Sequence, residues 1–154
     1  MKAFKKIAVI GKYPSKEESV DINNQLIELV DHLRQKSIEL FIEEKTQQQI
    51  NVEGIQAIAL KDIGSCVDLA IIIGGDGTMI GVARNLVDSN TPLIGVNQGR
   101  FGFLADLNTS SMLTNIDSIL NGEYIEDKRM LINTRIIRGD RVVYESLSLN
   151  DIVI

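Results

Sequence analysis

Three glycines and an aspartate follow the most apolar segment of the chain, in the run Gly74-Gly-Asp-Gly-Thr78. Glycines at the end of a strand permit backbone conformations with φ > 0, and they let backbone N–H groups approach an anion with no Cβ in the way. A helix that begins there adds its unpaired N–H groups and its dipole. These residue types therefore predict a loop that binds phosphate groups.

Asp76 lies inside this loop, where a carboxylate repels phosphates unless it serves another purpose. Binding a hydroxyl group, helping to hold a metal ion and accepting a proton are purposes that suit a carboxylate beside a phosphate. We therefore expect phosphoryl transfer rather than passive phosphate binding. The alternative is a tight turn between a strand and a helix, in which the glycines serve packing alone.

The loop differs from two well-known phosphate-binding motifs. No Gly-Lys-Ser/Thr follows it, as a P-loop requires. The spacing Gly75-x-Gly77-x-x-x-Gly81 is similar to a dinucleotide-binding fingerprint, but that weak pattern lies deep in the chain rather than after its first strand. Neither motif accounts for the segment.

The segments around the loop alternate between strand-like and helix-like patterns, which favours a layered α/β domain with a largely parallel sheet. The run Leu69–Ile73 is continuously apolar, as a strand buried on both faces requires. Strands are expected at residues 6–10, 38–42, 69–73 and 93–96, and helices at 20–36, 47–50, 78–87 and 110–120. The glycine loop thus joins a buried strand to a helix.

The sequence pattern changes near residue 125. Residues 130–138 and 141–149 are rich in β-formers and flank Gly139-Asp140, which predicts a hairpin with a two-residue turn. We expect an α/β nucleotide-binding domain over residues 1–125, and the first strands of an all-β domain over residues 126–154. Since the last four residues read as an apolar strand, we expect the front part of a longer protein rather than a complete small domain.

Composition excludes several classes of protein. The chain has 154 residues, with 16 Lys and Arg against 21 Asp and Glu and a net charge of −5, which argues against a general nucleic-acid binder. No apolar stretch approaches the roughly 20 residues of a membrane span, and no signal-peptide pattern is present. A single cysteine, Cys66, cannot form an internal disulfide. We expect a cytoplasmic protein with no membrane or nucleic-acid partner.

The sequence resembles the bacterial NAD kinases, the ATP-NAD kinase family. The glycine loop alone is similar to those of NAD kinases and of diacylglycerol and sphingosine kinase-like proteins. The run Ile94-Gly-Val-Asn-Gln-Gly-Arg-Phe-Gly-Phe-Leu-Ala-Asp106 is more specific, since it is similar to the NAD kinase stretch G-I-N-x-G-x-L-G-F-L-T-D. The run Leu149-Asn-Asp-Ile-Val-Ile154 resembles the family's L-N-E-V-V-I. The resemblance covers essentially the whole chain.

This resemblance implies transfer of the γ-phosphoryl group of ATP to the 2′-hydroxyl of the adenosine ribose of NAD, giving NADP. It implies that Asp76 accepts the proton of this hydroxyl with Gly77 beside it, and that Asn150 and Asp151 contact the adenosine part of NAD. The chemistry agrees, because a carboxylate can orient a weakly nucleophilic hydroxyl and accept its proton late in the transfer. ATP, a divalent cation such as Mg²⁺ and a homo-oligomer are implied as well, with no metal ligands assigned.

Departures from the family pattern limit what can be carried over. Asp151 stands where glutamate is usual, and Phe101 where leucine is usual. Gly81 occupies a position that is basic in some relatives, so no ATP contact is carried over there. In the family a second, β-rich domain supplies most of the NAD pocket, so the 154-residue chain alone is expected to be inactive.

Two alternatives remain open. One is a lipid or sphingoid kinase with the same glycine loop, and the other, for this chain alone, is a non-catalytic nucleotide-binding module. For other residues we expect structural roles: Glu43 and Glu44 as solvated charges, His32 as a surface residue, and Phe103 either near a nucleotide base or as a plug in the core.

Overall fold

The computed structural model describes residues 4–12, 19–98, 102–105 and 107–149, without the side chains of Ser19 and Val20. The chain divides into two compact units, residues 1–124 and 125–154. Each unit is described by itself below.

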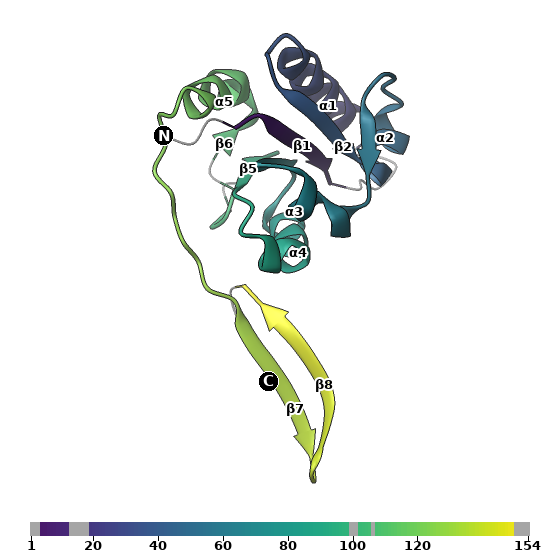
Figure 1. The fold of residues 1–154 in the computed structure, drawn as a ribbon, viewed down its shortest axis with the longest axis vertical. Coiled ribbons are helices and arrows are strands. Elements are labelled where there is room, and N and C mark those ends of the chain that lie inside the picture. Colours follow the sequence, from purple (N-terminus) through teal and green to yellow (C-terminus); the bar gives the residue numbers. More distant parts are fainter. Residues whose placement is uncertain (1–3, 13–18, 99–101, 106, 150–154) are drawn as a thin grey trace. The chain divides into compact units, whose positions relative to one another are not determined.

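The first unit is built on a six-stranded sheet (Figure 1). The strand order is β3-β2-β1-β4-β5-β6, and every described pairing is parallel. The strands are β1 (Lys6–Gly11), β2 (Glu39–Glu43), β3 (Gln56–Ile58), β4 (Leu69–Ile73), β5 (Leu93–Asn97) and β6 (Leu107–Asn108). The helices are α1 (Ser19–Arg34), α2 (Glu44–Ile50), α3 (Ile63–Cys66), α4 (Asp76–Leu86) and α5 (Met112–Leu120). The predicted α/β fold with a largely parallel sheet is confirmed.

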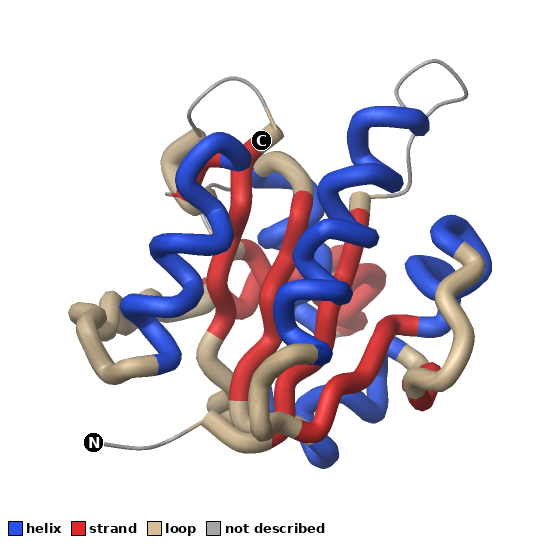
Figure 2. The backbone as a smooth tube through the Cα atoms, turned by 90° about the horizontal axis from the view of Figure 1, so that it is seen from above, coloured by secondary structure: helices blue, strands red, loops and turns tan. Residues whose placement is uncertain are grey.

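Helices cover both faces of this sheet (Figure 2). Side chains alternate between the two faces along a strand. Val9, Ile71 and Val96 point to one face, where they form a core with the apolar residues of α1 and α5. The opposite face is covered by α4, whose buried Met79 approaches Gly95 of β5. This double cover explains why β1 and β4 are apolar along almost their whole length.

The centre of the sheet is the place where the strand order reverses. From β1 the chain proceeds to β2 and β3 on one side, and from β4 it proceeds to β5 and β6 on the other. The backbone N–H of Lys12, just after β1, donates to the carbonyl oxygen of Ile73 at the end of β4, at 2.8 Å. Open α/β sheets of this order bind ligands in the crevice at the carboxyl ends of these central strands. The glycine loop follows β4 at this position.

Most predicted elements are present with ends shifted by a few residues. The helix after the glycine loop begins at Asp76 rather than Thr78, because the Gly75 carbonyl accepts from the N–H groups of Thr78 and Met79 at 3.0 and 3.2 Å. Three short elements, β3, β6 and α3, were not predicted. They contain two to four residues each, too few for a periodic apolar pattern to show.

The second unit contains the predicted hairpin, formed by the antiparallel strands β7 (Ile132–Arg138) and β8 (Arg141–Ser148). Its turn places Gly139 at φ +59°, in the left-handed region that glycine adopts readily. Hydrogen bonds from Asn133 and Arg135 hold the pKa of the Glu145 carboxyl below its usual value. Large apolar side chains of both strands are exposed: Ile132, Ile136, Ile137, Val142, Val143 and Tyr144.

Among the described residues, no helix combines the length and the apolar character that crossing a membrane requires.

Candidate functional site

The glycine loop continues the sheet before it turns into α4. The N–H of Gly74 donates to the carbonyl oxygen of Val96 at 2.9 Å, and Gly75 is the N-cap of α4 with φ −96°. The loop does not use the freedom of φ that glycine permits, because the glycines with positive φ in the described chain lie elsewhere: Gly54, Gly122 and Gly139.

The atoms around each glycine of the loop show whether packing explains why a glycine stands there. A Cβ on Gly74 would lie 2.7 Å from Oγ1 of Thr78, so packing explains this glycine. A Cβ on Gly75 or on Gly77 would meet no atom of the described residues within 4 Å. Neither packing within the described chain nor φ requires glycine at these two positions. As far as the described residues are concerned, the backbone at the start of α4 is therefore open to a close approach.

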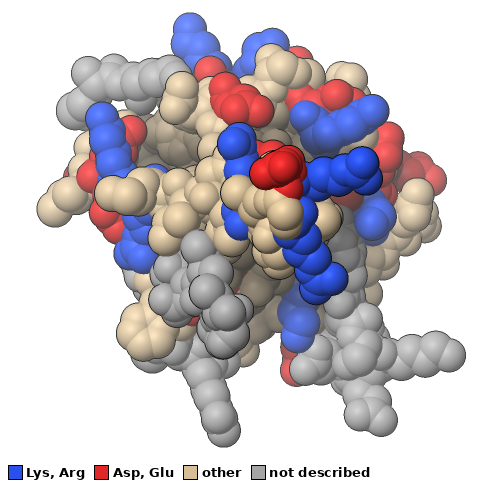
Figure 3. All heavy atoms as spheres, turned by 90° about the horizontal axis from the view of Figure 1, so that it is seen from below, with Lys and Arg blue, Asp and Glu red and all other residues tan. Residues whose placement is uncertain are grey.

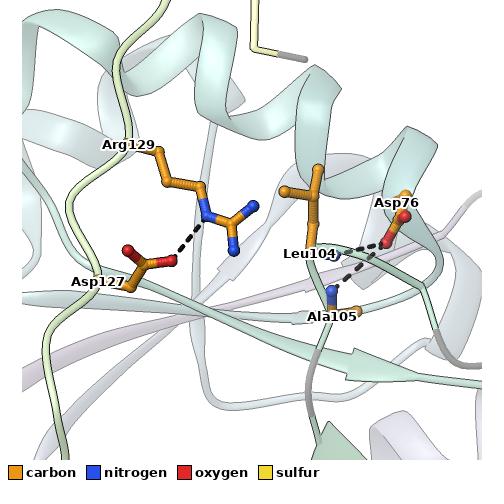
Figure 4. A network of polar contacts seen from close by, with 5 residues as sticks. All are labelled: Asp76, Leu104, Ala105, Asp127 and Arg129. Carbon is orange, nitrogen blue, oxygen red and sulfur yellow. Dashed lines mark hydrogen bonds and ion pairs between the residues drawn. The ribbon is translucent and has the colours of Figure 1, made fainter.

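Asp76 is held by backbone N–H groups from the second motif (Figure 4). Its Oδ2 accepts from the N–H of Phe103 at 2.8 Å, and its Oδ1 accepts from the N–H groups of Leu104 and Ala105 at 3.1 and 3.4 Å. Two of the three segments that carry the family resemblance thus meet at one carboxylate. Figure 4 also draws an ion pair of the second unit, between Asp127 and Arg129.

Two glycines allow the second motif to come this close. A Cβ on Gly102 would lie 2.0 Å from Oδ1 of Asp76. A Cβ on Gly95 would lie 2.9 Å from Cα of Ala105 and 2.9 Å from Sδ of Met79. Sequence reasoning gave neither glycine a role, although both belong to the second motif. Only the course of the loop shows which atoms they face.

Of the other residues singled out in the sequence, Gly77 and Phe103 lie within the described residues. Gly77 lies in the first turn of α4, directly after Asp76, and is exposed. Phe103 is 83% exposed, so it does not plug the core. Asn150 and Asp151 lie outside the described residues, and their expected contacts with NAD remain predictions.

A buried polar network at the ends of β1 and β2 was missed. Glu43 is only 2% exposed, so the expectation that it is a solvated charge is wrong. Its carboxylate accepts from the N–H and the hydroxyl of Thr46, both at 2.8 Å, and so caps α2. The N–H of Gly11 in turn donates to the Thr46 hydroxyl at 2.9 Å. This network ties the end of β1 to the start of α2.

Charged side chains of both signs lie on the surface of the first unit and near the candidate site. On the face drawn in Figure 3, Lys and Arg side chains are interspersed with Asp and Glu. The described part of the chain contains no group of three His, Cys, Asp or Glu side chains that could hold a metal ion.

Comparison with known proteins identifies the family. The family model described as the ATP-NAD kinase N-terminal domain matches residues 9–124, which is most of the chain. The chain belongs to this family. Curated relatives include the NAD kinases of Nitrosomonas eutropha and of Azoarcus sp., at 39% identity over 151 residues and 38% over 152. Each alignment covers 98% of this chain and 50% of the relative, so the chain spans about half the length of these NAD kinases.

Solved structures of NAD kinases share the fold. A crystal structure of yeast NADH kinase complexed with NADH has a TM-score of 0.78 at 14% identity, over 97% of this chain and 48% of that one. An NAD kinase from Archaeoglobus fulgidus in complex with ATP has a TM-score of 0.59 at 16% identity, over 89% and 45% of the two chains. At these identities the likeness concerns the fold alone.

Proposed function

We propose that this chain is the nucleotide-binding part of an ATP-dependent NAD kinase, which phosphorylates the 2′-hydroxyl of the adenosine ribose of NAD to give NADP. One observation carries the proposal: an oriented carboxylate, Asp76, begins a helix beside two glycines whose backbone is open. The carboxylate and the two glycines lie where the strand order of the sheet reverses. Membership in the ATP-NAD kinase N-terminal domain family supports this choice of substrates.

The start of α4 suits the phosphates of ATP. The first N–H groups of a helix lack partners within the helix, and the dipole adds a partial positive charge there. Because a Cβ on Gly75 or Gly77 would have open space around it, phosphate oxygens can approach the backbone at these residues.

Asp76 suits the acceptor hydroxyl. An ionised carboxylate offers about four lone-pair positions. Three are taken by the N–H groups of Phe103, Leu104 and Ala105, of which Oδ1 receives two. As far as the described residues are concerned, one position on Oδ2 is left for a ribose hydroxyl, which the carboxylate would orient and whose proton it would accept as the phosphoryl group transfers. Gly77 leaves room beside it, and Asn150 and Asp151 are proposed to contact the adenosine.

Mg²⁺ belongs to the proposal as part of the ATP complex. In phosphoryl-transfer enzymes this ion takes many of its ligands from the substrate phosphates and from water. The Asp76 carboxylate is the acidic group at the start of α4, and three of its lone-pair positions are used by backbone N–H groups. We therefore assign Mg²⁺ to the nucleotide rather than to a site built by the protein.

The alternatives are less well supported. A lipid or sphingoid kinase would share the glycine loop, but the second motif that surrounds Asp76 is the one that resembles NAD kinases. The chain acting alone as a non-catalytic nucleotide-binding module is the second alternative, since the chain spans half the length of its curated relatives. We also propose that the protein forms a homo-oligomer, as the family resemblance implies. We further propose that it is cytoplasmic, in agreement with its single cysteine.

The direct test uses a hybrid enzyme, in which this chain replaces the matching half of the curated relative at 39% identity. The intact relative serves as the positive control. With ATP, Mg²⁺ and NAD, the hybrid should form NADP, and diacylglycerol should not be phosphorylated. Phosphorylation of diacylglycerol without formation of NADP would instead establish the lipid kinase alternative.

A further inference from the structure

We infer that Gly102 is a positioning residue for Asp76: it lets the segment of residues 102–105 close around the carboxylate and fix its orientation. The importance of that orientation for catalysis rests on the proposed function. The contact itself does not, because it is defined by the described atoms of the two segments.

The need for glycine at position 102 comes from space and not from backbone conformation. Gly102 is not among the residues with positive φ. A Cβ there would lie 2.0 Å from Oδ1, 2.5 Å from Cγ and 2.7 Å from Oδ2 of Asp76. The three nearest atoms thus all belong to the carboxyl group of one residue. The Asp76 carboxyl group is therefore the nearest obstacle to a side chain at this position.

The same carboxylate can relieve such a clash only at the expense of its hydrogen bonds. An aspartate side chain is short, and it moves mainly by rotation about χ1 and χ2. Either rotation displaces both oxygens from the N–H groups of Phe103, Leu104 and Ala105. An added methyl group at position 102 therefore breaks the arrangement in one of two ways: the carboxylate turns away, or the segment withdraws.

Gly95 secures the other end of this segment. Its missing side chain lets Cα of Ala105 pack against β5, and Ala105 itself is fully buried. With Ala105 fixed on the sheet and Gly102 against the carboxylate, the two residues between them must present their N–H groups to Asp76. Among the described residues, the hydrogen bonds to the carboxylate thus come from the backbone, and two glycines allow its approach.

Hydrogen exchange of individual backbone amides tests the contact directly in the 154-residue chain. In Gly102→Ala, the amides of Phe103, Leu104 and Ala105 should exchange about tenfold faster or more, because each loses or weakens a hydrogen bond. Amides of β4 should keep their protection. Unchanged exchange at all three amides in Gly102→Ala would overturn the inference.

Gly64→Ala is the matched control. A Cβ on Gly64 would lie 2.4 Å from Oγ of Ser89, so this substitution also creates a clash with a side chain, at a different place in the first unit. It should lower the overall stability without selective exposure of the amides at 103–105. The same selective exposure in Gly64→Ala would contradict a specific role for Gly102.

Rescue by a second substitution separates positioning from a general structural need. In an Asp76→Ala background the clashing carboxylate is absent, so adding Gly102→Ala should produce little further change in amide exchange or in stability to urea. If glycine were needed there for another structural reason, Gly102→Ala would lower stability to urea equally with Asp76 and with Asp76→Ala. Such additivity would overturn the inference. This comparison remains valid if Gly102→Ala alone fails to fold.

A kinetic readout connects the contact to catalysis. In the hybrid enzyme, Gly102→Ala should lower kcat about 100-fold with little change in KM for ATP, since a displacement of about 1 Å at a reacting group has this effect. An unchanged kcat despite exposed amides would refute positioning. If the hybrid makes no NADP even with Gly102 in place, the proposed function fails. The exchange and rescue experiments still show whether Gly102 positions Asp76.

Discussion

A carboxylate that accepts from three backbone N–H groups is oriented by the course of the chain. Among the described residues, the partners of Asp76 lie at positions 103–105 and donate from their peptide groups. Substitutions of the Phe103 or Leu104 side chain can leave these bonds intact, whereas a substitution of Gly102 cannot. The identity of the glycines therefore matters more to this site than the identity of the residues that donate.

Gly77 offers a prediction at the level of a single residue. Replacing it with alanine should leave the fold intact and stabilise it by about 0.5 kcal/mol, because alanine favours a helix and its methyl group would meet no atom of the described residues within 4 Å. Nucleotide binding should nevertheless weaken, since the methyl group would occupy the space proposed for the ligand. Urea unfolding and calorimetric titration with ATP measure the two effects.

Gly81→Ala is the control for that experiment. Gly81 also lies in α4 with open space around it, one turn beyond Gly77. Alanine there should stabilise the helix to a similar extent and leave ATP binding unchanged. Equal binding by Gly77→Ala and the wild type would show that the open space at Gly77 has no part in recognition.

The Thr46 hydroxyl supports a second prediction at this scale. Thr46→Val removes an acceptor for the N–H of Gly11 and a donor to the Glu43 carboxylate, both in a buried place. The free energy of unfolding should fall by about 2 kcal/mol, the cost of leaving such groups without partners. Thr46→Ser keeps the hydroxyl and should lose distinctly less. Equal losses in the two variants, measured in urea, would mean that the methyl group matters rather than the network.

At the scale of elements, one charged cluster joins α5 to α1. Asp117 on α5 accepts from Nε2 of His32 at 2.7 Å, and its Oδ1 lies 2.6 Å from Nζ of Lys36, just after α1. Burial raises the pKa of Asp117, but the hydrogen bonds from Lys36 and His32 outweigh it and bring the pKa below 3.8. His32 is thus part of a connection between two helices and not only a surface residue.

This cluster predicts how stability depends on pH. Because the pKa of Asp117 is lower in the folded state, the cluster stabilises the fold above pH 3.8, and this contribution disappears as the pH falls below that value. It should amount to about 0.5–1 kcal/mol, since the groups are partly exposed and screened by salt. Asp117→Asn should therefore lose more stability at pH 6 than at pH 2.5, as measured by urea unfolding.

Asp31→Asn provides the control for that pH dependence. Asp31 also lies on α1, and it pairs with Arg34 at 3.4 Å with more than half of its side chain exposed. Its replacement should change stability little at either pH. An equal effect of the two substitutions would show that the cluster at Asp117 contributes no more than an ordinary surface pair.

The elements also show what a sequence can predict and what it cannot. β4 is predictable because a run of buried apolar residues leads directly into glycines, and the chemistry of Asp76 follows from its residue type. The partners of Asp76 are not predictable, because peptide N–H groups have no signature in a sequence and the course of residues 102–105 decides which of them it meets. Likewise nothing in Glu43-Glu44 reveals that the first carboxylate caps α2 in the interior while the second is exposed.

At the scale of the whole molecule, the α/β unit contains an oriented carboxylate, an open helix start and the central reversal of strand order. These features belong to residues 9–124, the range that matches the family model. The curated relatives are about twice as long as this chain, so half of their length lies outside the alignment. The hybrid enzyme supplies that remainder and makes the role of this half measurable.

The most direct measurement is the rate of NADP formation by the hybrid enzyme with Asp76 or with Asp76→Asn. Asparagine keeps the size of the side chain but can neither accept the hydroxyl proton nor receive N–H groups on both of its terminal atoms. We expect NADP formation to fall at least 100-fold, roughly the contribution of one general base, while an Asp88→Asn control on the surface after α4 retains full activity. A wild-type rate in Asp76→Asn would contradict the account.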